Sequence, residues 1–404
     1  MQVSYRNGSA IPHLLTLNQF PRPEFSGLRD FLFPAVCLAL VISLRPGAAI
    51  GLVTFTVYCA MTLRALALTT GEPHRDFSTG TALASNIATA IHLLYLSDPV
   101  HQFRHEKDTM DPAALPMLKR WYWVLCLLHS PRGIGWSYRV AHTPCSPQQK
   151  RWHFVFLRLG RAIALFLIID VAQTYIHSNP SFTHPTPYNS PFTSQGYLLR
   201  CVNIVAWLTV SHGTLNMNYT ALSAACVAIG LSEPQDWPDL FGSWRESYTV
   251  RRYWGRTWHQ LMRRYTSSIG KYCAQSLGFE KGTKRSSYTQ LYAGFIVSAL
   301  VHMGGDCMVG RQYVGSTFPF FIMQAVVITV EDVVIGLGKR TCVRCPLVVG
   351  YVWVFVWFML SRAWYIQWAV DAGLGKEQPF KFSVMQVLLN YSDNARAVMH
   401  KHVL

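Results

Sequence analysis

Residues 291–303 read Leu-Tyr-Ala-Gly-Phe-Ile-Val-Ser-Ala-Leu-Val-His-Met, an apolar stretch in which the histidine alone titrates near neutral pH. The stretch lies in one of nine apolar runs, most of them close to the length of about 20 residues that a membrane-spanning helix needs. The runs are 31–44, 48–66, 81–97, 153–176, 198–215, 217–231, 289–305, 316–338 and 347–370. This pattern predicts an all-α, polytopic integral membrane protein, a bundle of about 8–10 apolar helices.

The composition agrees with a membrane protein and argues against a nucleic-acid-binding one. Of the 404 residues, 50% are hydrophobic and 14% are charged, whereas soluble domains carry about 25% charged residues. The formal net charge is +16, but Lys and Arg collect between the apolar runs, mainly at 104–151 and 245–285. Such basic loops are typical of the cytoplasmic side of a membrane. We therefore expect contact with membrane lipid and none with nucleic acid.

The loop charges also predict a topology. Segment 177–196 contains no Lys or Arg and is expected to be luminal, with cytoplasmic basic regions on either side of it. An even number of crossings must separate those regions, yet three apolar runs lie there. The shortest, 217–231, is about 22 Å long as a helix, and we expect it to be re-entrant or interfacial. Run 289–305 then leads outward and 316–338 returns, which places Lys339 and Arg340 in the cytoplasm.

Residues 250–265 read Val-Arg-Arg-Tyr-Trp-Gly-Arg-Thr-Trp-His-Gln-Leu-Met-Arg-Arg-Tyr. On one helix, four of these side chains form a basic stripe within about 60° of one another, with Trp and Leu on the opposite side. The stripe consists of Arg252, Arg256, His259 and Arg263. The pattern predicts an amphipathic helix at the membrane interface. Two roles of its arginines stay open. They would either lie in water and anchor the helix at the membrane interface, or pair with the phosphates of coenzyme A.

His302 is the candidate for chemistry in run 289–305. An ionisable side chain deep in a membrane helix predicts a function, and the alternative is a neutral core histidine bonded to a neighbour such as Ser298. His302 lies 14 residues beyond Tyr288, about 20 Å from the cytoplasmic end of the helix, so a donor would reach it through a tunnel. Asp306, one turn later, is a candidate to orient the imidazole, unless the glycine pair between them ends the helix.

Three motifs resemble the membrane-bound O-acyltransferase superfamily, in particular its wax-synthase-like branch of fungal terpenoid biosynthesis. They are Tyr253-Trp-Gly-Arg-Thr-Trp-His259, Ser298-Ala-Leu-Val-His302-Met-Gly-Gly305 and Arg132-Gly-Ile-Gly-Trp136. The resemblance implies a multi-pass enzyme of the endoplasmic reticulum that moves an acyl group from acyl-CoA to a hydroxyl. Because position 259 is His, as is frequent in the fungal branch, it implies acetyl-CoA as donor and a hydrophobic terpenoid or meroterpenoid alcohol as acceptor. A long-chain wax-ester synthase is the alternative.

The resemblance also implies the site residues. His302 matches the family's catalytic histidine, and His259 matches a second site position that is often Asn in plant wax synthases. Because imidazole, with a pKa of about 6.5, suits proton removal from a hydroxyl, we assign His302 as the general base. His259 would stabilise the oxyanion or orient the substrates. The candidates to bind acyl-CoA are Arg252, Arg256, Arg263 and Trp258. A single membrane-embedded domain, 1–404, is expected, with its catalytic core near 243–310.

A membrane-bound di-iron desaturase or hydroxylase is a rival interpretation. Such sites need several histidine clusters, and this chain offers one His-x-x-x-His pair, His101 and His105, which would share a helical face. Cys342 and Cys345 form a single Cys-x-x-Cys without the second pair that a zinc site requires. We therefore predict no metal in this protein.

A membrane transporter is the rival from a non-enzymatic class. Arg158, Arg161 and Asp170 lie within run 153–176 and are candidates to line a pathway. Many transporters consist of repeated halves, and no repeat is evident in this sequence. Pairing of these charges at a helix end is the simpler interpretation.

Overall fold

The computed structural model of the chain describes residues 22–183, 191–341, 345–378, 380 and 382–392. Over these residues the protein is helical, and its β-type pairing is limited to two isolated bridges. The helices are α1 (Phe33–Leu44), α2 (Ala48–Ala65), α3 (Pro73–Tyr95), α4 (Pro99–Gln102), α5 (Met117–Leu128), α6 (Arg151–Ser178), α7 (Pro180–Thr183), α8 (Tyr197–Ala228), α9 (Val250–Arg252), α10 (Arg263–Ser276), α11 (Lys284–Val309), α12 (Phe318–Arg340) and α13 (Leu347–Asp371). The predicted all-α class is confirmed.

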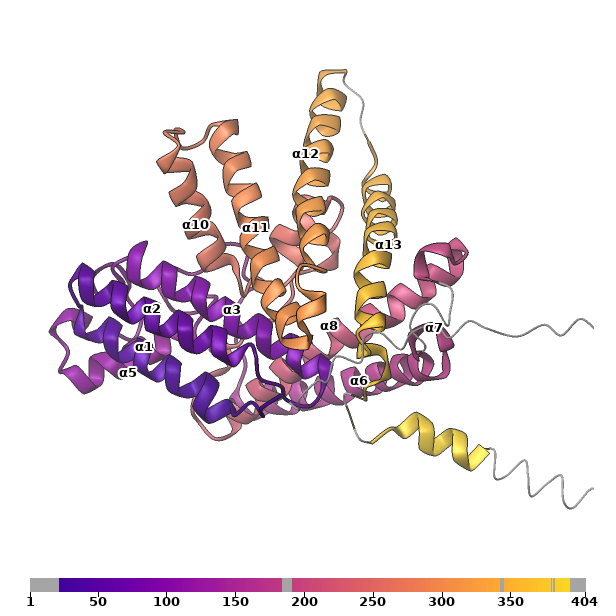
Figure 1. The fold of residues 1–404 in the computed structure, drawn as a ribbon, viewed down its shortest axis with the longest axis horizontal. Coiled ribbons are helices and arrows are strands. Elements are labelled where there is room, and N and C mark those ends of the chain that lie inside the picture. Colours follow the sequence, from indigo (N-terminus) through magenta and orange to yellow (C-terminus); the bar gives the residue numbers. More distant parts are fainter. Residues whose placement is uncertain (1–21, 184–190, 342–344, 379, 381, 393–404) are drawn as a thin grey trace, which may run out of the picture.

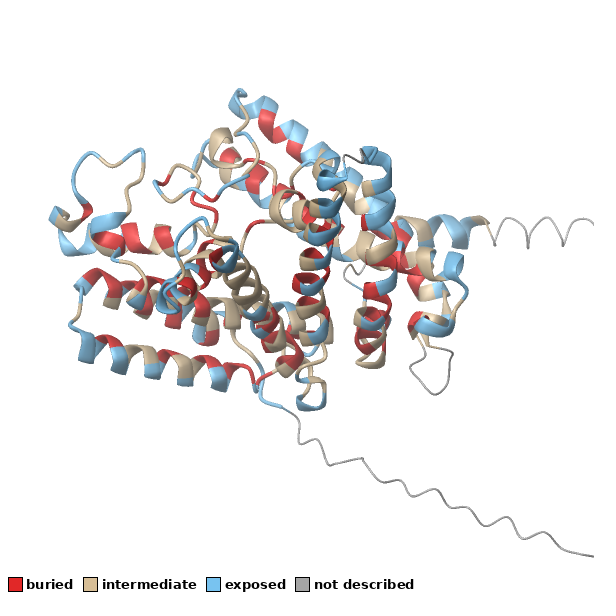
Figure 2. Cartoon of the chain, turned by 90° about the horizontal axis from the view of Figure 1, so that it is seen from above, coloured by how far each residue is buried: buried red, intermediate tan, exposed pale blue. Residues whose placement is uncertain are grey.

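The long helices fall into three groups (Figure 1). Helices α10, α11, α12 and α13 stand next to one another in sequence order. Helices α1, α2, α3 and α5 pack together on one side of them, and the pair α6 and α8 lies on the other. Figure 2 shows that buried residues follow the inner faces of the helices, whereas exposed residues follow the outer faces.

Among the residues that the structure describes, six helical segments are long and apolar enough to cross a membrane, by length and composition. They are Gly27–Leu44, Ala48–Ala65, Tyr197–Ala228, Lys284–Val309, Arg311–Arg340 and Leu347–Asp371. Their outer faces carry exposed apolar side chains, such as Leu52 and Val53 of α2 and Val334 of α12. Helices suit this environment because all of their backbone hydrogen bonds form within the helix, so that lipid needs to supply none.

Four of the predicted runs differ from the expectation. Runs 81–97 and 153–176 fall in α3 and α6, which are not among the six segments. Runs 198–215 and 217–231 form one continuous helix, α8, so the prediction that 217–231 is a separate re-entrant or interfacial element is wrong. The chain stays helical at Asn216, which lies between the two runs, because its side chain and that of nearby Thr220 are buried inside the protein. With these runs joined, α6 and α8 are the two long helices between the basic regions.

The contact between α3 and α11 depends on glycines. A Cβ atom at Gly304 would lie 2.5 Å from Ala84 Cβ and 2.7 Å from the Gly80 carbonyl oxygen, and a Cβ at Gly305 would lie 2.6 Å from the Phe77 carbonyl oxygen. Such separations are far below van der Waals contact. Small residues at these positions therefore let two helix backbones approach closely and set the position of α11 next to α3.

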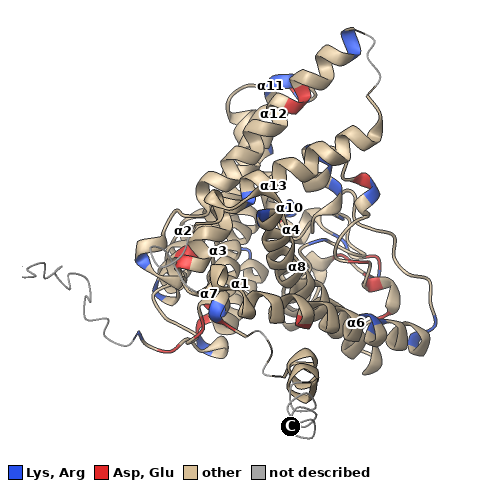
Figure 3. Ribbon diagram, turned by 90° about the vertical axis from the view of Figure 1, so that its right-hand side faces the viewer, with Lys and Arg blue, Asp and Glu red and all other residues tan. Residues whose placement is uncertain are grey.

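The basic residues of α11 and α12 lie at one end of the molecule. Figure 3 shows Lys and Arg at the tip of α12 and beside it at the start of α11, while the rest of these helices is nearly free of charge. The residues are Lys284, Arg285, Lys339 and Arg340. Tyr288 near the start of α11 donates a hydrogen bond to Asp332 of α12 (3.2 Å), as an antiparallel pair requires. The loop charges predict that this end is cytoplasmic.

Candidate active site

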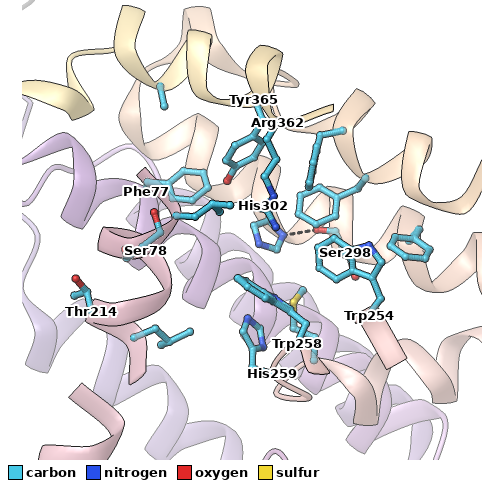
Figure 4. Close-up of a pocket in the computed structure, with 18 of the residues that line it drawn as sticks. Phe77, Ser78, Thr214, Trp254, Trp258, His259, Ser298, His302, Arg362 and Tyr365 are labelled. Carbon is cyan, nitrogen blue, oxygen red and sulfur yellow. Dashed lines mark hydrogen bonds between the residues drawn. The ribbon is translucent and has the colours of Figure 1, made fainter. Parts of the chain in front are cut away.

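A cavity of about 1000 Å³ lies at the centre of the helices. Its walls come from the start of α3, the middle of α8, residues 254–263, and α10, α11, α12 and α13. Four of the six predicted site residues line it, namely Trp258, His259, Arg263 and His302. The walls therefore extend well outside the predicted core near 243–310. In the view of Figure 4, Arg362 and Tyr365 enter from one side and Trp258 and His259 from the other, with His302 between them.

His302 projects from α11 with a defined tautomer. Its Nδ1 lies 2.8 Å from the carbonyl oxygen of Ser298, so Nδ1 must carry the proton and donate it. Nε2 then carries the lone pair, and it forms no hydrogen bond within the part of the chain that the structure describes. The ring packs against Phe321, with 4.2 Å between ring centroids. A bond to Ser298 was the alternative to a functional role, yet this bond leaves Nε2 free to accept a proton from a ligand in the cavity.

Asp306 does not orient His302. Its Oδ2 accepts hydrogen bonds from the backbone N–H and the hydroxyl of Thr317, at 3.0 and 2.9 Å. The carboxylate thus holds the turn between α11 and α12. The glycine pair does not end the helix, which continues to Val309. The prediction for Asp306 is wrong because the nearby carbonyl of Ser298 already accepts the His302 Nδ1–H bond.

Residues 250–265 are not one helix. A π-helical turn, Tyr253–Thr257, follows α9; the backbone is then extended at Trp258 (φ −66°, ψ 153°), and α10 begins at Arg263. The side-chain amide of Gln260 donates to the carbonyl oxygens of Trp254 and Trp258, at 3.0 and 2.6 Å. These bonds satisfy carbonyl groups that the break leaves without helical partners. The predicted continuous amphipathic helix is therefore wrong.

The break separates the members of the predicted basic stripe. Arg252 and Arg256 both pair with Glu246 and do not line the cavity. Arg263 does line it, and its Nη1 donates to the carbonyl oxygen of Gly255 (3.2 Å) and to Oε1 of Gln260 (3.1 Å). Of the three predicted coenzyme-binding arginines, Arg263 is therefore the one on the cavity wall.

His259 lies at the break, outside the six candidate membrane segments. Its ring packs beside Trp258 and Phe241, with centroid separations of 5.3 and 5.9 Å. Its Nδ1 is buried and has no hydrogen-bond partner among the described residues. Burial, together with the nearby His302 and Arg132, lowers the pKa of His259 to about 3. The imidazole is therefore neutral near pH 7 and can donate one N–H to a ligand.

Arg362 is a cavity residue that the sequence analysis missed. It lies on α13, is 7% exposed, and lines the cavity. Its guanidinium group lies over the rings of Phe358 and Trp258, at 4.9 and 5.7 Å from their centroids. Its Nη2 donates to the hydroxyl of Tyr253 at 3.2 Å. Arg362 is the sole charged residue in run 347–370, so the rule that singled out His302 would have found it.

The residues of the rival interpretations have structural partners. Helix α4 ends at Gln102, so His101 and His105 do not share a helical face, and His101 pairs with Asp98 at 2.7 Å. Arg158 and Arg161 both bind Asp239, each at 2.7 Å. Asp170 accepts the backbone N–H of Met385 at 2.9 Å. Cys342 of the Cys-x-x-Cys pair lies outside the described residues.

Comparison with known proteins identifies the class to which this cavity belongs. Residues 237–323 match the membrane bound O-acyl transferase family, and residues 150–228 match the aspirochlorine biosynthesis protein F C-terminal domain. The acetyltransferase ple2 of Rhodocybe pseudopiperita is 34% identical over 340 residues, which cover 81% of this chain and 86% of that protein. The acetyltransferase eriL of Hericium erinaceus is 27% identical, with 80% and 85% covered. The O-mevalon transferase yanI of Aspergillus niger is 28% identical, with 83% of each covered.

These matches define a membrane-bound enzyme of acyl transfer. The chain belongs to the membrane bound O-acyl transferase family, and it is related to fungal acetyltransferases of secondary metabolism. It is a multi-pass membrane protein that takes an acyl donor and an alcohol acceptor. No solved structure matches it.

Proposed function

We propose that this protein transfers an acetyl group from acetyl-CoA to a hydroxyl of a terpenoid or meroterpenoid in the endoplasmic-reticulum membrane. The observation that carries the proposal is His302, whose Nδ1 is occupied by Ser298 and whose Nε2 is left free on the wall of a large cavity. The donor is supported by the two acetyltransferases among the relatives described above. One domain, with its chemistry centred near 243–310, would carry out the reaction.

The base in this mechanism is Nε2 of His302. The acceptor O–H transfers its proton to Nε2 while its oxygen forms a bond to the thioester carbon, and the carbonyl electron pair moves onto oxygen. His259, as a neutral imidazole, donates its N–H to this oxyanion. When the carbonyl reforms, the C–S bond breaks. The His302 imidazolium then returns its proton to the coenzyme A thiolate, which yields the ester and the free thiol.

Coenzyme A would approach from the basic end of the molecule. Arg263 and Trp258 lie on the cavity wall, where a guanidinium group can pair with a phosphate and an indole can stack on the adenine or pantetheine. Arg252 and Arg256, paired with Glu246 outside the wall, would attract the coenzyme at longer range. Acetyl is small beside a cavity of about 1000 Å³, so most of the remaining volume would hold the acceptor.

The test is acyl transfer by microsomes that contain the full chain. Labelled acetyl-CoA and labelled palmitoyl-CoA are each supplied with a panel of hydroxylated sesquiterpenoids and diterpenoids and with long-chain alcohols. We expect a labelled acetyl ester of a terpenoid, absent from microsomes without the protein. Palmitoyl esters of long-chain alcohols would favour the wax-ester synthase instead. Accumulation of terpenoid inside sealed vesicles without ester would favour transport.

A further inference from the structure

The charge of Arg362 is poorly balanced by the protein. The side chain is 7% exposed, and no carboxylate lies within ion-pair distance of it in the described ranges. Its Nε is buried without a hydrogen-bond partner among those residues. A buried guanidinium without a counter-ion is costly, because it has lost its hydration. The rings of Phe320, Phe358 and Trp258 offset part of that cost through cation–π contact.

Other buried arginines of this protein are better satisfied. Arg158 pairs with the Asp239 carboxylate and also donates to the Trp237 carbonyl oxygen at 2.8 Å. Arg132 donates to two backbone carbonyl oxygens and to the Tyr219 hydroxyl. Arg362, by contrast, has the Tyr253 hydroxyl as its hydrogen-bond acceptor in the described structure. Arg264 also has a buried Nε without a partner among the described residues, but it donates to the Leu127 carbonyl oxygen and the Tyr138 hydroxyl. Of these four arginines, Arg362 is the one that lines the cavity and has the fewest hydrogen-bond acceptors in the described structure.

A second unpartnered polar group lies on the neighbouring helix. Thr214 of α8 lines the cavity, and its Oγ1 is buried without a partner among the described residues. Helix α8 packs against α13, which carries Arg362 and, one turn later, Tyr365 on the same cavity wall. Figure 4 shows both Thr214 and Arg362 around the space that His302 faces. The α8–α13 wall thus offers two polar groups in addition to the base on α11.

The depth of Arg362 separates it from the part of the cavity assigned to coenzyme phosphates. It lies 15 residues into α13 from Leu347, about 22 Å from the basic end. His302 lies 18 residues into α11 from Lys284, about 27 Å along that helix. The two side chains are therefore at similar depth, where the donor presents its thioester and acetyl group and not its phosphates.

We propose that Arg362 and Thr214 form a second polar anchor, which binds an oxygen of the acceptor other than the hydroxyl that is acylated. This inference rests on the proposed function and narrows its acceptor class. The acceptor is an alcohol that carries a second hydrogen-bond-accepting oxygen, such as a ketone, an ester or a carboxylate. A guanidinium donates to such an oxygen, and the Thr214 hydroxyl adds a second donor. Holding both ends would fix which hydroxyl meets His302.

The experiment compares acceptors in matched pairs. Each pair is a terpenoid keto-alcohol and the same alcohol without the ketone, in monoterpenoid, sesquiterpenoid and diterpenoid sizes. Binding to the purified full chain is followed by quenching of tryptophan fluorescence without acetyl-CoA, since Trp254 and Trp258 line the cavity. Acetyl transfer is then measured separately. Binding is thus scored even where transfer fails, so that failure of the anchor and failure of the acetyltransferase proposal are distinguishable.

The variants are Arg362→Met, Arg362→Lys and Thr214→Val. Wild type should bind at least one keto-alcohol about 10-fold or more tightly than its partner, and Arg362→Met should abolish that preference. Thr214→Val should reduce it, and Arg362→Lys should restore part of it. The control is Arg264→Met, an equally buried arginine outside the cavity, which should leave the preference intact in the protein that folds.

Three results would overturn the anchor. The first is wild-type protein that binds both members of every pair equally. The second is an Arg362→Met protein, or Thr214→Val if that variant alone folds, that keeps the full keto-alcohol preference. The third is an Arg362→Met protein whose KM for acetyl-CoA rises while its acceptor preference stays, which would assign Arg362 to the donor.

Discussion

Two histidine-bearing segments meet at one cavity, and their backbones are built differently. Helix α11 carries His302 on an unbroken helix that continues through Gly304 and Gly305. The segment before α10 carries His259 at a break, after a π-helical turn and an extended residue. The sequence predicts a helix for both segments, from apolar length for α11 and from periodicity for residues 250–265. The comparison teaches that such a prediction holds where no other hydrogen-bond partner for the backbone is near.

The physical difference is the supply of alternative partners. Helix α11 is apolar and long enough to span a membrane, and lipid offers nothing to a broken backbone. Around residue 258, the Gln260 side chain and the N–H of Gly242 bind the carbonyl oxygens that the break releases. The break also turns His259 toward the cavity and leaves Arg252 and Arg256 beside Glu246.

The unbroken helix should be the more sensitive of the two to added volume. Gly304→Ala places a Cβ 2.5 Å from Ala84 Cβ, and overpacking of this kind costs about 3 kcal/mol. We expect little folded protein and a large loss of activity. The control is Gly336→Ala on α12, where a Cβ meets nothing within 4 Å. The measurement is the yield of monodisperse protein in detergent, with its Tm. Equal yields of the two variants would contradict the packing described for α3 and α11.

The broken segment should be more sensitive to loss of its histidine than to loss of its arginines. His259→Gln removes the neutral imidazole N–H proposed to bind the oxyanion. We expect kcat to fall about 100-fold with little change in KM. Steady-state kinetics with acetyl-CoA measure this. A variant with unchanged kcat and a raised KM would show that His259 binds substrate in the ground state instead.

The arginines of the basic stripe should differ in their effect on the KM for acetyl-CoA, according to whether they line the cavity. Arg263→Gln should raise the KM for acetyl-CoA by about 10-fold, the loss of one charge-assisted hydrogen bond. Arg252→Gln should change it less than about 2-fold at moderate salt, because its guanidinium group is held by Glu246 away from the cavity. Titrations of acetyl-CoA at two salt concentrations measure both. The reverse order would mean that the coenzyme binds outside the cavity wall.

The smallest expected effect is on the pH dependence of stability. The unfolded pKa of a histidine is about 6.5, whereas His259 in the folded protein has a pKa of about 3. Between these values the unfolded chain binds a proton that the folded chain does not, so stability falls as pH falls. The contribution is at most about 1.4 kcal/mol per pH unit below 6.5. The Tm of wild type should therefore drop more between pH 7 and 5.5 than that of His259→Gln. Parallel drops would mean that His259 is solvated.

The sequence was sufficient for the helical class and for the place of His302 within an apolar helix. Run 289–305 is apolar apart from one histidine. Its apolar length predicts a membrane helix, and the histidine is its one evident candidate for a function. The same reasoning would have found Arg362, whose run also has one charged residue. Continuity of α8 was not predictable, because Asn216 and Asn218 interrupt the apolar pattern, and the helix continues through them with Asn216 buried by tertiary contacts.

The break at Trp258 was also beyond the reach of periodicity. It depends on Gly242, which is close to Thr257 in space but 15 residues away in sequence, and on the side chain of Gln260. The choice between the two candidate partners of His302 was open for a related reason. Asp306 and Ser298 are both four residues from His302, and only the structure shows that Asp306 is held by Thr317.

The central claim is that His302 is the base of acetyl transfer, and one comparison of variants tests it most directly. Labelled ester is measured for wild type, His302→Ala and His92→Ala at equal amounts of folded protein. His92 is also a buried histidine, bonded to Ser268 at 2.9 Å, but it does not line the cavity. We expect His302→Ala to lose about 100-fold or more of the rate and His92→Ala to keep most of it. Ester formed by His302→Ala at the wild-type rate would contradict the account.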